Sequence, residues 1–360
     1  MTESEKPKVT LQSRGNLQFA NEMLSGKILA ITGGTGSFGS ALIRGLLQTD
    51  VLEIRVISRD EDKQDKLIRK FMDSRIRCIV ADVRDRWNME TVLRKVDILF
   101  HAAALKQVPT GEFFPTEVVA TNTLGSENVL FAAVRNQINK VVLLSTDKAV
   151  NPINAMGMSK ALMEKIGLSY ARLEDSGTSI TITRYGNVLC SRGSVIPKFI
   201  EQRKLGKPIT LTDGRMTRFL MSLDDAIDLV FYALSTGQNG NTLIKYAPAA
   251  KIKDLAIAVS NLVGSGPHYL NEIGIRYGEK IHESLISDDE LSVATFGNGF
   301  FCIPLARDGL KQLLPLEKGS EVSQLVGPFT SESTEQLSVV QIMKLLETNY
   351  EFNSLLHNDA

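Results

Sequence analysis

Residues 27–39 read KILAITGGTGSFG, a short apolar run that leads directly into a glycine-rich turn. Gly34, Gly36 and Gly39 fit the spacing G-x-G-x-x-G. Taking Gly33 in place of Gly34 gives the variant spacing G-x-x-G-x-x-G. Glycines in such a turn let the backbone approach a pyrophosphate, and the helix that follows presents amide donors at its positive end. Because the turn joins a buried-type strand to a helix, it predicts a dinucleotide-binding unit rather than a turn that binds nothing.

From this turn onward, short apolar runs alternate with longer amphipathic segments. Runs rich in β-branched residues lie at 27–32, 53–58, 77–82, 96–104, 140–146 and 179–187. Segments with apolar residues at helical spacing lie at 40–48, 121–135 and 159–173. Six strands in this alternation predict an α/β fold with a Rossmann doubly wound parallel sheet.

Beyond Asn187 the alternation fades into shorter elements separated by glycine, proline and polar turns. This change predicts a smaller α/β C-terminal substrate lobe. We expect a helix at 224–235 and a strand at 241–246 that returns to the main sheet.

The C-terminal part is predicted to contain one more helix. Ser338 and Gln341 form a capping-box pattern before an apolar-periodic run to Leu346, and the tail at 351–360 is expected to fray. The predicted division is an N-terminal extension (1–24), a Rossmann domain (25–188), the substrate lobe (189–325) and a C-terminal helix with its tail (326–360).

Composition excludes several classes of function. The chain has 360 residues, which favours a cofactor domain with a smaller partner, and its 41 basic residues balance its 41 acidic ones. No overall field therefore attracts nucleic acid or an anionic membrane. The three cysteines lie far apart without metal-ligand spacing, and no run resembles a signal peptide or a membrane span. We expect a cytoplasmic protein with a small-molecule substrate, without a metal, nucleic acid or membrane as partner.

The second predicted strand ends in Ser58, Arg59 and Asp60, where the ribose of the adenosine half is bound in this fold. An arginine there suits the 2′-phosphate of NADP, so Ser58 and Arg59 favour that cofactor. Asp60 would suit the ribose hydroxyls of NAD, which stays as the alternative. Asp82 and Val83 end the third strand, where they can meet the adenine.

The fourth predicted strand leaves through His101 and the three alanines at 102–104. These small residues let the backbone lie against a dinucleotide, and Lys106 follows them near the phosphates or the substrate. His101 is expected to be structural, because a lone histidine at a strand end is usually satisfied by its neighbours.

Six segments together resemble one family, the inverting UDP-N-acetylglucosamine 4,6-dehydratases of the extended short-chain dehydrogenases. The segments are TGGTGSFG (32–39), SRDE (58–61), HAAALKQVP (101–109), STDKAVNPINAMGMSK (145–160), RYGNV (184–188) and TRFLMS (217–222). The resemblance covers most of residues 25–290. It implies NADP as cofactor, UDP-N-acetylglucosamine as substrate, and the product UDP-2-acetamido-2,6-dideoxy-β-L-arabino-hexos-4-ulose for capsule or O-antigen biosynthesis. It also implies a homo-oligomer, either a dimer or a hexamer.

One position departs from the short-chain dehydrogenases. They carry Tyr-x-x-x-Lys, in which the tyrosine takes the proton of the oxidised hydroxyl, whereas Met156 precedes Lys160 here. Methionine cannot transfer a proton, so the chain is either an inactive Rossmann protein or an enzyme whose proton chemistry lies elsewhere. The adjacent Asp147 and Lys148 favour the second reading. The resemblance implies Asp-Lys in inverting dehydratases and Asp-Glu in retaining ones, with methionine at 156 as part of the inverting pattern.

The chemistry implied by the resemblance has three steps: hydride leaves C-4, water is lost across C-5 and C-6, and hydride returns to C-6. Loss of water needs a base at C-5 and an acid at the C-6 hydroxyl, and we assign these roles to Lys148 and Asp147. A lysine with a pKa of about 10.4 is a poor base at neutral pH, so burial or cationic neighbours must lower the pKa of Lys148. Either Lys148 or water ordered by Thr146 takes the 4-hydroxyl proton, and both remain open.

The resemblance assigns the predicted site residues to three groups. The catalytic group is Asp147, Lys148, Thr146, Met156 and Lys160. The cofactor group is Gly33, Thr35, Gly36, Ser37, Phe38, Gly39, Ser58, Arg59, Asp82, Val83, Ala102, Ala103, Ala104, Lys106, Asn122 and Tyr185. The nucleotide-sugar group is Lys106, Asn187, Val195, Thr210, Arg218, Met221, Arg276 and Glu279.

Two other functions remain open from the sequence. One is an NADP-dependent epimerase or reductase acting on a nucleotide sugar, which a persistent need for added NADPH would favour. The other is a non-catalytic nucleotide-sugar-binding protein, for which Met156 is the main support.

Overall fold

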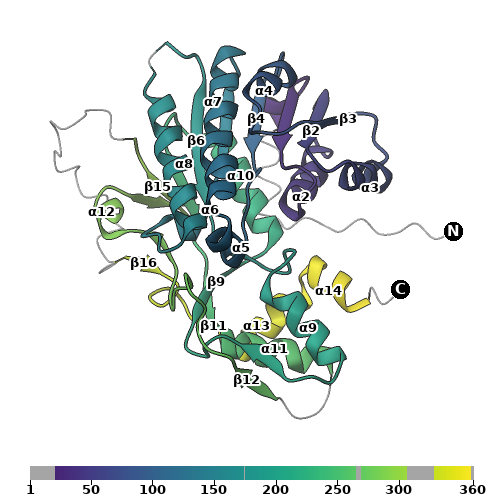
Figure 1. The fold of residues 1–360 in the computed structure, drawn as a ribbon, viewed down its shortest axis with the longest axis vertical. Coiled ribbons are helices and arrows are strands. Elements are labelled where there is room, and N and C mark those ends of the chain that lie inside the picture. The colour runs from purple at the N-terminus through teal and green to yellow at the C-terminus, as the bar shows by residue number, and fades with distance from the viewer. Residues whose placement is uncertain (1–20, 174, 265–268, 306–327, 358–360) are drawn as a thin grey trace.

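The structure is a computed structural model that describes residues 21–173, 175–264, 269–305 and 328–357. A sheet of nine strands forms its centre, in the order β14-β15-β10-β6-β5-β4-β1-β2-β3. All pairs from β3 across to β10 are parallel, and β15 and β14 continue the sheet antiparallel. Helices cover both faces of the sheet (Figure 1). The predicted Rossmann doubly wound α/β fold is confirmed.

The strands of this sheet are short and mostly apolar. They are β1 (Ile28–Thr32), β2 (Glu53–Ser58), β3 (Ile76–Val80), β4 (Ile98–His101), β5 (Lys140–Leu144), β6 (Ser179–Arg184), β10 (Thr242–Lys245), β14 (Thr295–Gly297) and β15 (Phe300–Ile303). The strand predicted at 241–246 does return to the sheet, because β10 pairs in parallel with β6. The run at 179–187 divides at Tyr185, since its last residues belong to another sheet.

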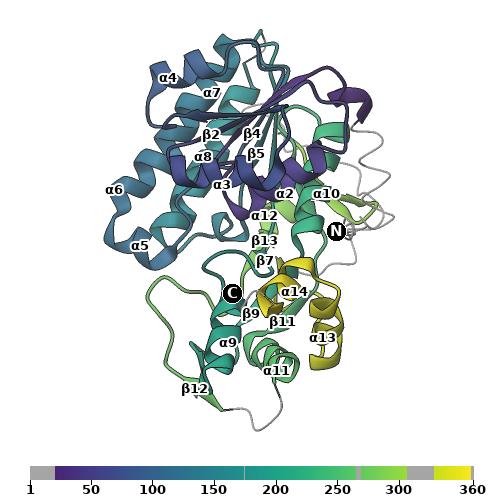
Figure 2. The ribbon, with the colours of Figure 1, turned by 90° about the vertical axis from the view of Figure 1, so that its right-hand side faces the viewer.

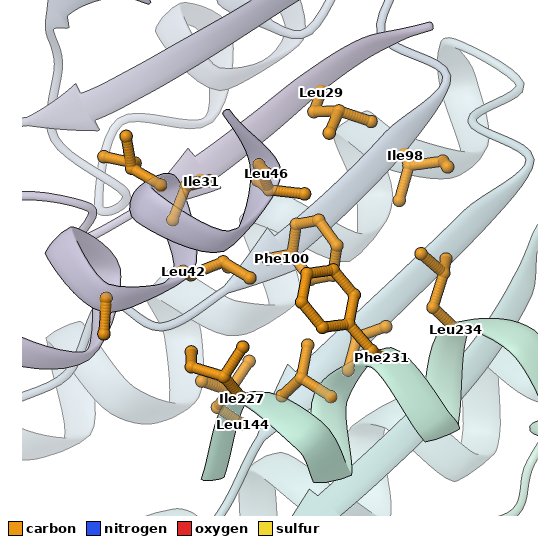
Figure 3. Close-up of a cluster of buried hydrophobic side chains, with 14 of the residues drawn as sticks. Leu29, Ile31, Leu42, Leu46, Ile98, Phe100, Leu144, Ile227, Phe231 and Leu234 are labelled. Carbon is orange, nitrogen blue, oxygen red and sulfur yellow. The ribbon is translucent and has the colours of Figure 1, made fainter. Parts of the chain in front are cut away.

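One face of the sheet is covered by α2 (Ser37–Leu46), α3 (Glu61–Phe71) and α10 (Leu223–Thr236). Leu42 and Leu46 of α2 meet Ile227 and Phe231 of α10 over Phe100 of β4 (Figure 3). All of these side chains except Ile227 and Phe231 are fully buried, and those two are nearly so. At about 25 cal/mol per Å² of apolar surface, such burial is the main stabilising contribution to this layer.

The other face carries α4 (Arg86–Val92), α7 (Gly125–Arg135) and α8 (Ala155–Ala171). The helix predicted at 121–135 begins as a π-helix, η1 (Val119–Leu124), which follows the short helices α5 (Val108–Phe113) and α6 (Pro115–Val118). The single-turn 3₁₀ helix η2 (Asp147–Ala149) follows β5 and contacts α8.

The remaining elements form a lobe beyond the carboxyl ends of the parallel strands (Figure 2). Its strands are β7 (Asn187–Val188), β8 (Ile209–Leu211), β9 (Thr217–Met221), β11 (Ala249–Lys251), β12 (Leu270–Glu272), β13 (Ser284–Ile286) and β16 (Phe329–Thr330). Its helices are α9 (Val195–Lys204), α11 (Ile252–Val263), α12 (Asp288–Leu291), α13 (Val339–Glu347) and α14 (Tyr350–His357). A domain boundary between residues 188 and 189 stays a prediction.

The C-terminal helices confirm one expectation and correct another. Ser338 and Gln341 make both hydrogen bonds of a capping box at the start of α13, as predicted. The tail was expected to fray from residue 351, but α14 continues to His357 and buries Phe352 against the lobe. Residues 358–360 lie outside the described residues. None of the described helices is both long and apolar enough to span a membrane.

Candidate active site

A cavity of about 1410 Å³ lies between the carboxyl edge of the parallel sheet and the lobe. Ligands bind at this edge in open α/β sheets, because strand ends and helix N-termini meet there. Every residue predicted for the site lines the cavity except Asn122 and Met221. The fold therefore brings together side chains from both halves of the chain.

The glycine-rich turn fits tightly between β1 and α2. Gly33 has a φ of +70°, and a Cβ there would lie 2.8 Å from the backbone of Ala103. A Cβ on Gly39 would lie 2.3 Å from the carbonyl oxygen of Gly34. At Gly36 a Cβ would meet only the oxygen of Gly33, at 3.4 Å, so the protein itself does not require glycine there. Gly36 faces the cavity, where the missing side chain lets a ligand approach the backbone.

The segment after β2 places Arg59, Asp60 and Lys63 along the cavity, and the Asp60 carboxylate also caps the next helix. Asp60 caps α3 by accepting from the backbone of Lys63, and the Lys63 ammonium pairs with the same carboxylate. The side-chain hydrogen bond from Lys63 lowers the pKa of Asp60. Arg59 is half exposed and contacts Asp82 at 3.2 Å, so its charge remains at the cavity wall.

Asn122 lies behind the cavity wall and supports it. It is fully buried in η1, and its side chain binds both the N–H and the carbonyl of Leu105, as well as the hydroxyl of Ser159. The prediction that Asn122 touches the cofactor is therefore not matched by its position. Its bonds fix the loop of alanines that leads to Lys106. Burial and the nearby Arg192 lower the pKa of Lys106, because both disfavour its charged form.

His101 is structural, as expected. Its ring nitrogens lie 2.7 Å from the Thr32 hydroxyl and 2.8 Å from the Ser126 hydroxyl. Because Ser126 donates to the carbonyl of Asn122, it accepts from His101, and Thr32 in turn donates to the other nitrogen. Complete burial lowers the pKa of His101 to about 3, so the ring is neutral.

Asp147 and Lys148 follow β5 in η2. The Asp147 carboxylate is fully buried, and its Oδ1 accepts from the Thr146 hydroxyl at 2.7 Å and from Lys148 Nζ at 3.0 Å. Gly157 of α8 packs directly on this turn, because a Cβ there would lie 2.3 Å from the Lys148 carbonyl oxygen. The close approach of α8 therefore fixes the position of the Lys148 backbone, from which its side chain extends.

Met156 and Lys160 lie one turn apart on α8, and both are buried and line the cavity. The Lys160 ammonium donates to the carbonyl of Leu144 at 2.6 Å and lies 3.2 Å from the sulfur of Met163. Burial lowers the pKa of Lys160 to about 8, although Glu164 acts in the opposite direction. The Met156 thioether has no proton to transfer, so it adds no acid–base group to the cavity.

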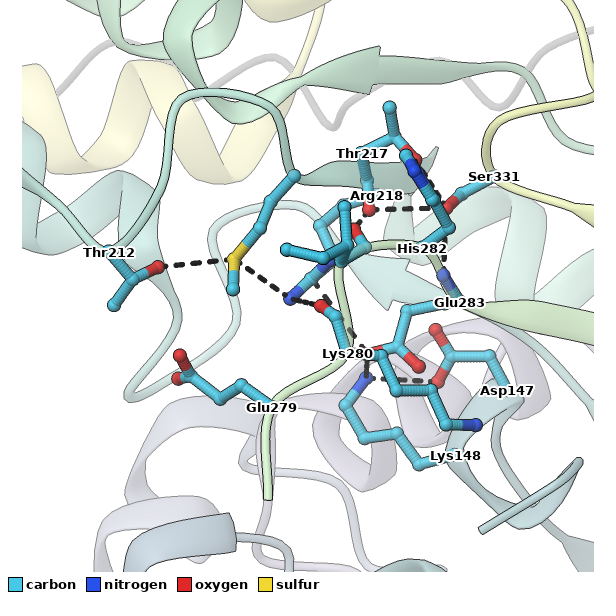
Figure 4. Close-up of polar contacts among 12 residues, drawn as sticks. Asp147, Lys148, Thr212, Thr217, Arg218, Glu279, Lys280, His282, Glu283 and Ser331 are labelled. Atoms are coloured by element: carbon cyan, nitrogen blue, oxygen red, sulfur yellow. Dashed lines mark hydrogen bonds and ion pairs between the residues drawn. The ribbon is translucent and has the colours of Figure 1, made fainter. Parts of the chain in front are cut away.

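Glu283 joins the pair from the loop before β13 (Figure 4). Its Oε1 lies 3.4 Å from Lys148 Nζ and 3.8 Å from Arg218 Nε, and its side chain is only 3% exposed. Burial alone would lower the pKa of Lys148, but the charges of Asp147 and Glu283 outweigh it and the pKa is raised. The expectation that the surroundings lower the pKa of Lys148 is therefore wrong, because a second carboxylate from a distant segment of the chain faces this lysine.

Several buried polar atoms around the cavity have no partner within the protein. Among the described residues, six buried side-chain oxygens lack a hydrogen bond, and all six belong to residues that line this cavity. They are on Thr121, Ser145, Asp147, Asn187, Ser194 and Glu283. Buried polar atoms are nearly always paired, so their confinement to one cavity indicates a polar ligand that completes them.

The predicted nucleotide-sugar residues differ in position. Val195, Thr210, Arg276 and Glu279 line the lobe side of the cavity, and Arg276 lies 3.9 Å from Glu279. Met221 does not line the cavity but packs in an apolar cluster of buried side chains.

Arg218 is held mainly by the backbone. Its guanidinium donates to the carbonyls of Thr217, Ile281 and Lys280 at 2.7–3.0 Å. Because these N–H groups are engaged by carbonyls, few donors of Arg218 are left to bind the phosphates of a nucleotide sugar. Glu283 itself was missed, because a single Glu in Lys280-Ile-His-Glu283 carries no spacing that marks it as part of a site.

Comparison with known proteins gives a consistent picture. Residues 29–304 match the family described as polysaccharide biosynthesis protein. A Rickettsia massiliae protein named UDP-glucose 4-epimerase is 46% identical over 331 residues, which are 91% of this chain and 97% of that protein. The X-ray structure of Pen from Bacillus thuringiensis has a TM-score of 0.84 at 32% identity, covering 91% of this chain and 99% of Pen.

A more distant structure shares the fold alone. DesIV, a dTDP-glucose 4,6-dehydratase from Streptomyces venezuelae solved with NAD and TYD bound, has a TM-score of 0.64 at 24% identity. The match covers 71% of this chain and 86% of DesIV. Proteins with similar folds thus include both named epimerases and named dehydratases, so the assignment between them depends on the chemistry of this site.

Proposed function

The chain belongs to the polysaccharide biosynthesis protein family, and we propose that it is a nucleotide-sugar enzyme that dehydrates UDP-N-acetylglucosamine across C-5 and C-6 with inversion at C-5. One observation carries this proposal. The cavity is lined by Asp147 and Lys148, which contact each other at 3.0 Å, and by Met156, which stands where short-chain dehydrogenases carry a tyrosine. An adjacent acid and base suit elimination of water, which needs both at once.

The cavity fits a nicotinamide dinucleotide, which DesIV also binds. The turn from Gly33 to Gly39 and the N-terminus of α2 would hold its pyrophosphate, and Tyr185, stacked on Phe38 at 5.9 Å, lines the same end. Such a cofactor would supply a hydride acceptor and donor. We favour NADP, because Asp60 is already engaged by Lys63 while Arg59 remains at the wall for a 2′-phosphate.

The Asp147–Lys148 pair can generate an acid and a base together. In the ionic form Lys148 carries the proton and Asp147 carries the negative charge. Transfer of one proton along the 3.0 Å contact from Nζ to Oδ1 makes both groups neutral. No proton has to enter or leave the cavity for this step, so a raised pKa of Lys148 is compatible with its role as a base.

When the substrate carries a 4-ketone, the pair can then eliminate water with one proton accepted and one proton donated. Lys148 takes the C-5 proton, and the electrons of that bond form the C-5 to C-6 double bond. Asp147 gives its proton to the C-6 hydroxyl, which leaves as water. Lys148 is again an ammonium and Asp147 a carboxylate, so the pair returns to its starting form.

Thr146 and Lys160 would support this chemistry. The Thr146 hydroxyl donates to Asp147 Oδ1 at 2.7 Å and thereby orients the carboxyl. Lys160 is buried, with a pKa lowered to about 8, so its charge is sensitive to what binds next to it. The 4-hydroxyl proton goes either to water ordered by Thr146 or to Lys148, which in that case passes it to solvent before it acts as the base at C-5.

The second candidate is a 4-epimerase, which the name of the Rickettsia massiliae relative favours. A 4-epimerase exchanges configuration at C-4 without losing water, so it has no use for an acid at the C-6 hydroxyl. The buried Asp147 beside Lys148 therefore argues against it. A third candidate is a protein that binds a nucleotide sugar without turnover. Met156, which cannot transfer a proton, is the observation that favours it.

Proton NMR of the purified full-length protein with NADP and UDP-N-acetylglucosamine in deuterated water separates these candidates. A new C-6 methyl signal with deuterium at C-5 and inverted ring couplings supports the dehydratase. Inversion at C-4 without a methyl signal supports the epimerase. An unchanged spectrum from folded protein that binds NADP overturns both activities on this substrate.

A further inference from the structure

Glu283 is less completely paired than Glu164, another deeply buried carboxylate that forms an ion pair. Glu164 is also buried, but both of its oxygens bind Arg184, at 2.8 and 2.6 Å. Glu283 makes only long contacts through Oε1, and its Oε2 is buried without a partner. A carboxylate that served stability alone would be fully paired, because burial of an incompletely paired charge is costly.

The backbone around Glu283 is nevertheless fixed. The N–H of Glu283 donates to the Ser331 hydroxyl at 2.9 Å, and the N–H of Ser331 donates to the Glu283 carbonyl at 2.8 Å. The Thr217 hydroxyl contacts both Ser331, at 2.7 Å, and His282, at 2.8 Å (Figure 4). The carboxylate is therefore presented to the cavity from a rigid support.

The charges that face Lys148 come from separate elements. Asp147 is its neighbour in η2, Glu283 precedes β13, and Arg218 lies on β9. Lys280, whose ammonium donates to the Val150 carbonyl at 2.7 Å, is a further cation close to this group. Two carboxylates thus share the Lys148 ammonium, and the cations lie beyond them.

From this geometry we propose that Glu283 is a positioning residue whose carboxylate holds the Lys148 ammonium beside Asp147 and keeps on it the proton that the pair shares. This role rests on the proposed function, since the shared proton is the one that Asp147 receives before water leaves. Glu283 itself acts through Lys148 and requires no contact with the reacting atoms.

Removal of the charge at Glu283 tests this role by two independent readouts. The mechanism needs one proton shared between Lys148 and Asp147. Activity is therefore lost at high pH, where Lys148 releases this proton to solvent. We expect Glu283→Gln to move the alkaline limb of kcat/KM for UDP-N-acetylglucosamine to lower pH by about one unit or more, because an anionic neighbour is lost. Glu283→Asp keeps the charge and should stay much closer to the wild-type profile. An unmoved limb in Glu283→Gln overturns the proposal.

The second readout needs no turnover. Trace acetylation at pH 9 with acetic anhydride, followed by mass spectrometry, measures the unprotonated fraction of Lys148 relative to the exposed Lys66 in the same sample. We expect Lys148 to react about tenfold faster in Glu283→Gln than in wild type. Glu332→Gln, which removes an exposed carboxylate 3.5 Å from His282, is the matched control and should leave the rate unchanged.

The two readouts separate failure of the inference from failure of the proposed function. If wild type makes no dehydrated product but Lys148 reacts faster in Glu283→Gln, the coupling of Glu283 to Lys148 stands and the proposed reaction falls. If wild type makes the product and the acetylation rate is the same in both proteins, the reaction stands and the role of Glu283 falls.

Discussion

Two clusters of buried charge lie at the carboxyl ends of β5 and β6, and they are paired differently. Arg184 at the end of β6 is held by both oxygens of Glu164 and both oxygens of Glu290, at 2.6–2.8 Å. Lys148 after β5 has one short and one long carboxylate contact, and an oxygen of each carboxylate is left without a partner. The first arrangement satisfies its charges internally, and the second reserves acceptors for a ligand. Complete pairing indicates a structural role, and incomplete pairing at a cavity wall indicates a functional one.

The largest expected effect breaks the cavity cluster without removing its charge. Arginine in place of Lys148 keeps the cation between the carboxylates but cannot release a proton near neutral pH. Lys148→Arg should lower kcat by about a thousandfold with little loss of thermal stability. Turnover by the NMR assay and a thermal melt measure both quantities. Retained turnover would show that Lys148 is not the base.

The next effect breaks the structural cluster. Glu164→Gln leaves the buried Arg184 with one charged partner instead of two. The free energy of unfolding should fall by about 3 kcal/mol, as measured by denaturant titration. Turnover per folded molecule should change far less than in Lys148→Arg. A stable variant with lost turnover would reverse the assignment of the two clusters.

Lys160 is a third case beside the two clusters, because it is a buried cation that contacts a carbonyl and a sulfur but no carboxylate of the described residues at close range. Its pKa of about 8 lies below the unfolded value of 10.5, so the unfolded chain binds more protons between these pH values and stability rises with pH there. Below pH 8 the charged lysine costs the fold about 3 kcal/mol, partly offset by its bond to the Leu144 carbonyl.

Lys160→Met should therefore raise the free energy of unfolding by about 2 kcal/mol at pH 7. Most of the gain should be lost by about pH 10.5, where folded Lys160 is neutral and the same lysine in the unfolded chain is only half protonated. Turnover should fall, since a predicted catalytic cation is lost. Denaturant titrations at pH 7 and pH 10.5 measure the difference, and an equal gain at both values would argue against a buried charge.

The smallest effect on stability concerns an exposed pair. Arg59 lies half exposed at 3.2 Å from Asp82, and such pairs contribute less than about 1 kcal/mol. Arg59→Ala should leave the melting temperature nearly unchanged but weaken NADP binding about tenfold or more relative to NAD. Calorimetric titration with both dinucleotides tests this. Equal weakening of both would indicate that Arg59 does not meet a 2′-phosphate.

Local patterns predicted much of the fold and one half of the site. The parallel strands, the glycine turn and the capping box at Ser338 were all readable, because strand, turn and helix-start preferences act over a few neighbouring residues. The tail at 351–357 was not, because α14 forms through the packing of Phe352 on the lobe rather than through a strong local signal.

The sequence by itself determined that a Rossmann sheet carries an Asp147–Lys148 pair with methionine in the tyrosine position. Only the tertiary structure decided how that pair is charged. Glu283 reaches Lys148 from a loop far away in the sequence, and Asn122 and Met221 lie behind the cavity wall rather than in it. The reason is physical: strand and turn preferences are short-range, whereas the protonation of a buried lysine depends on every charge that the packed chain brings within a few ångströms.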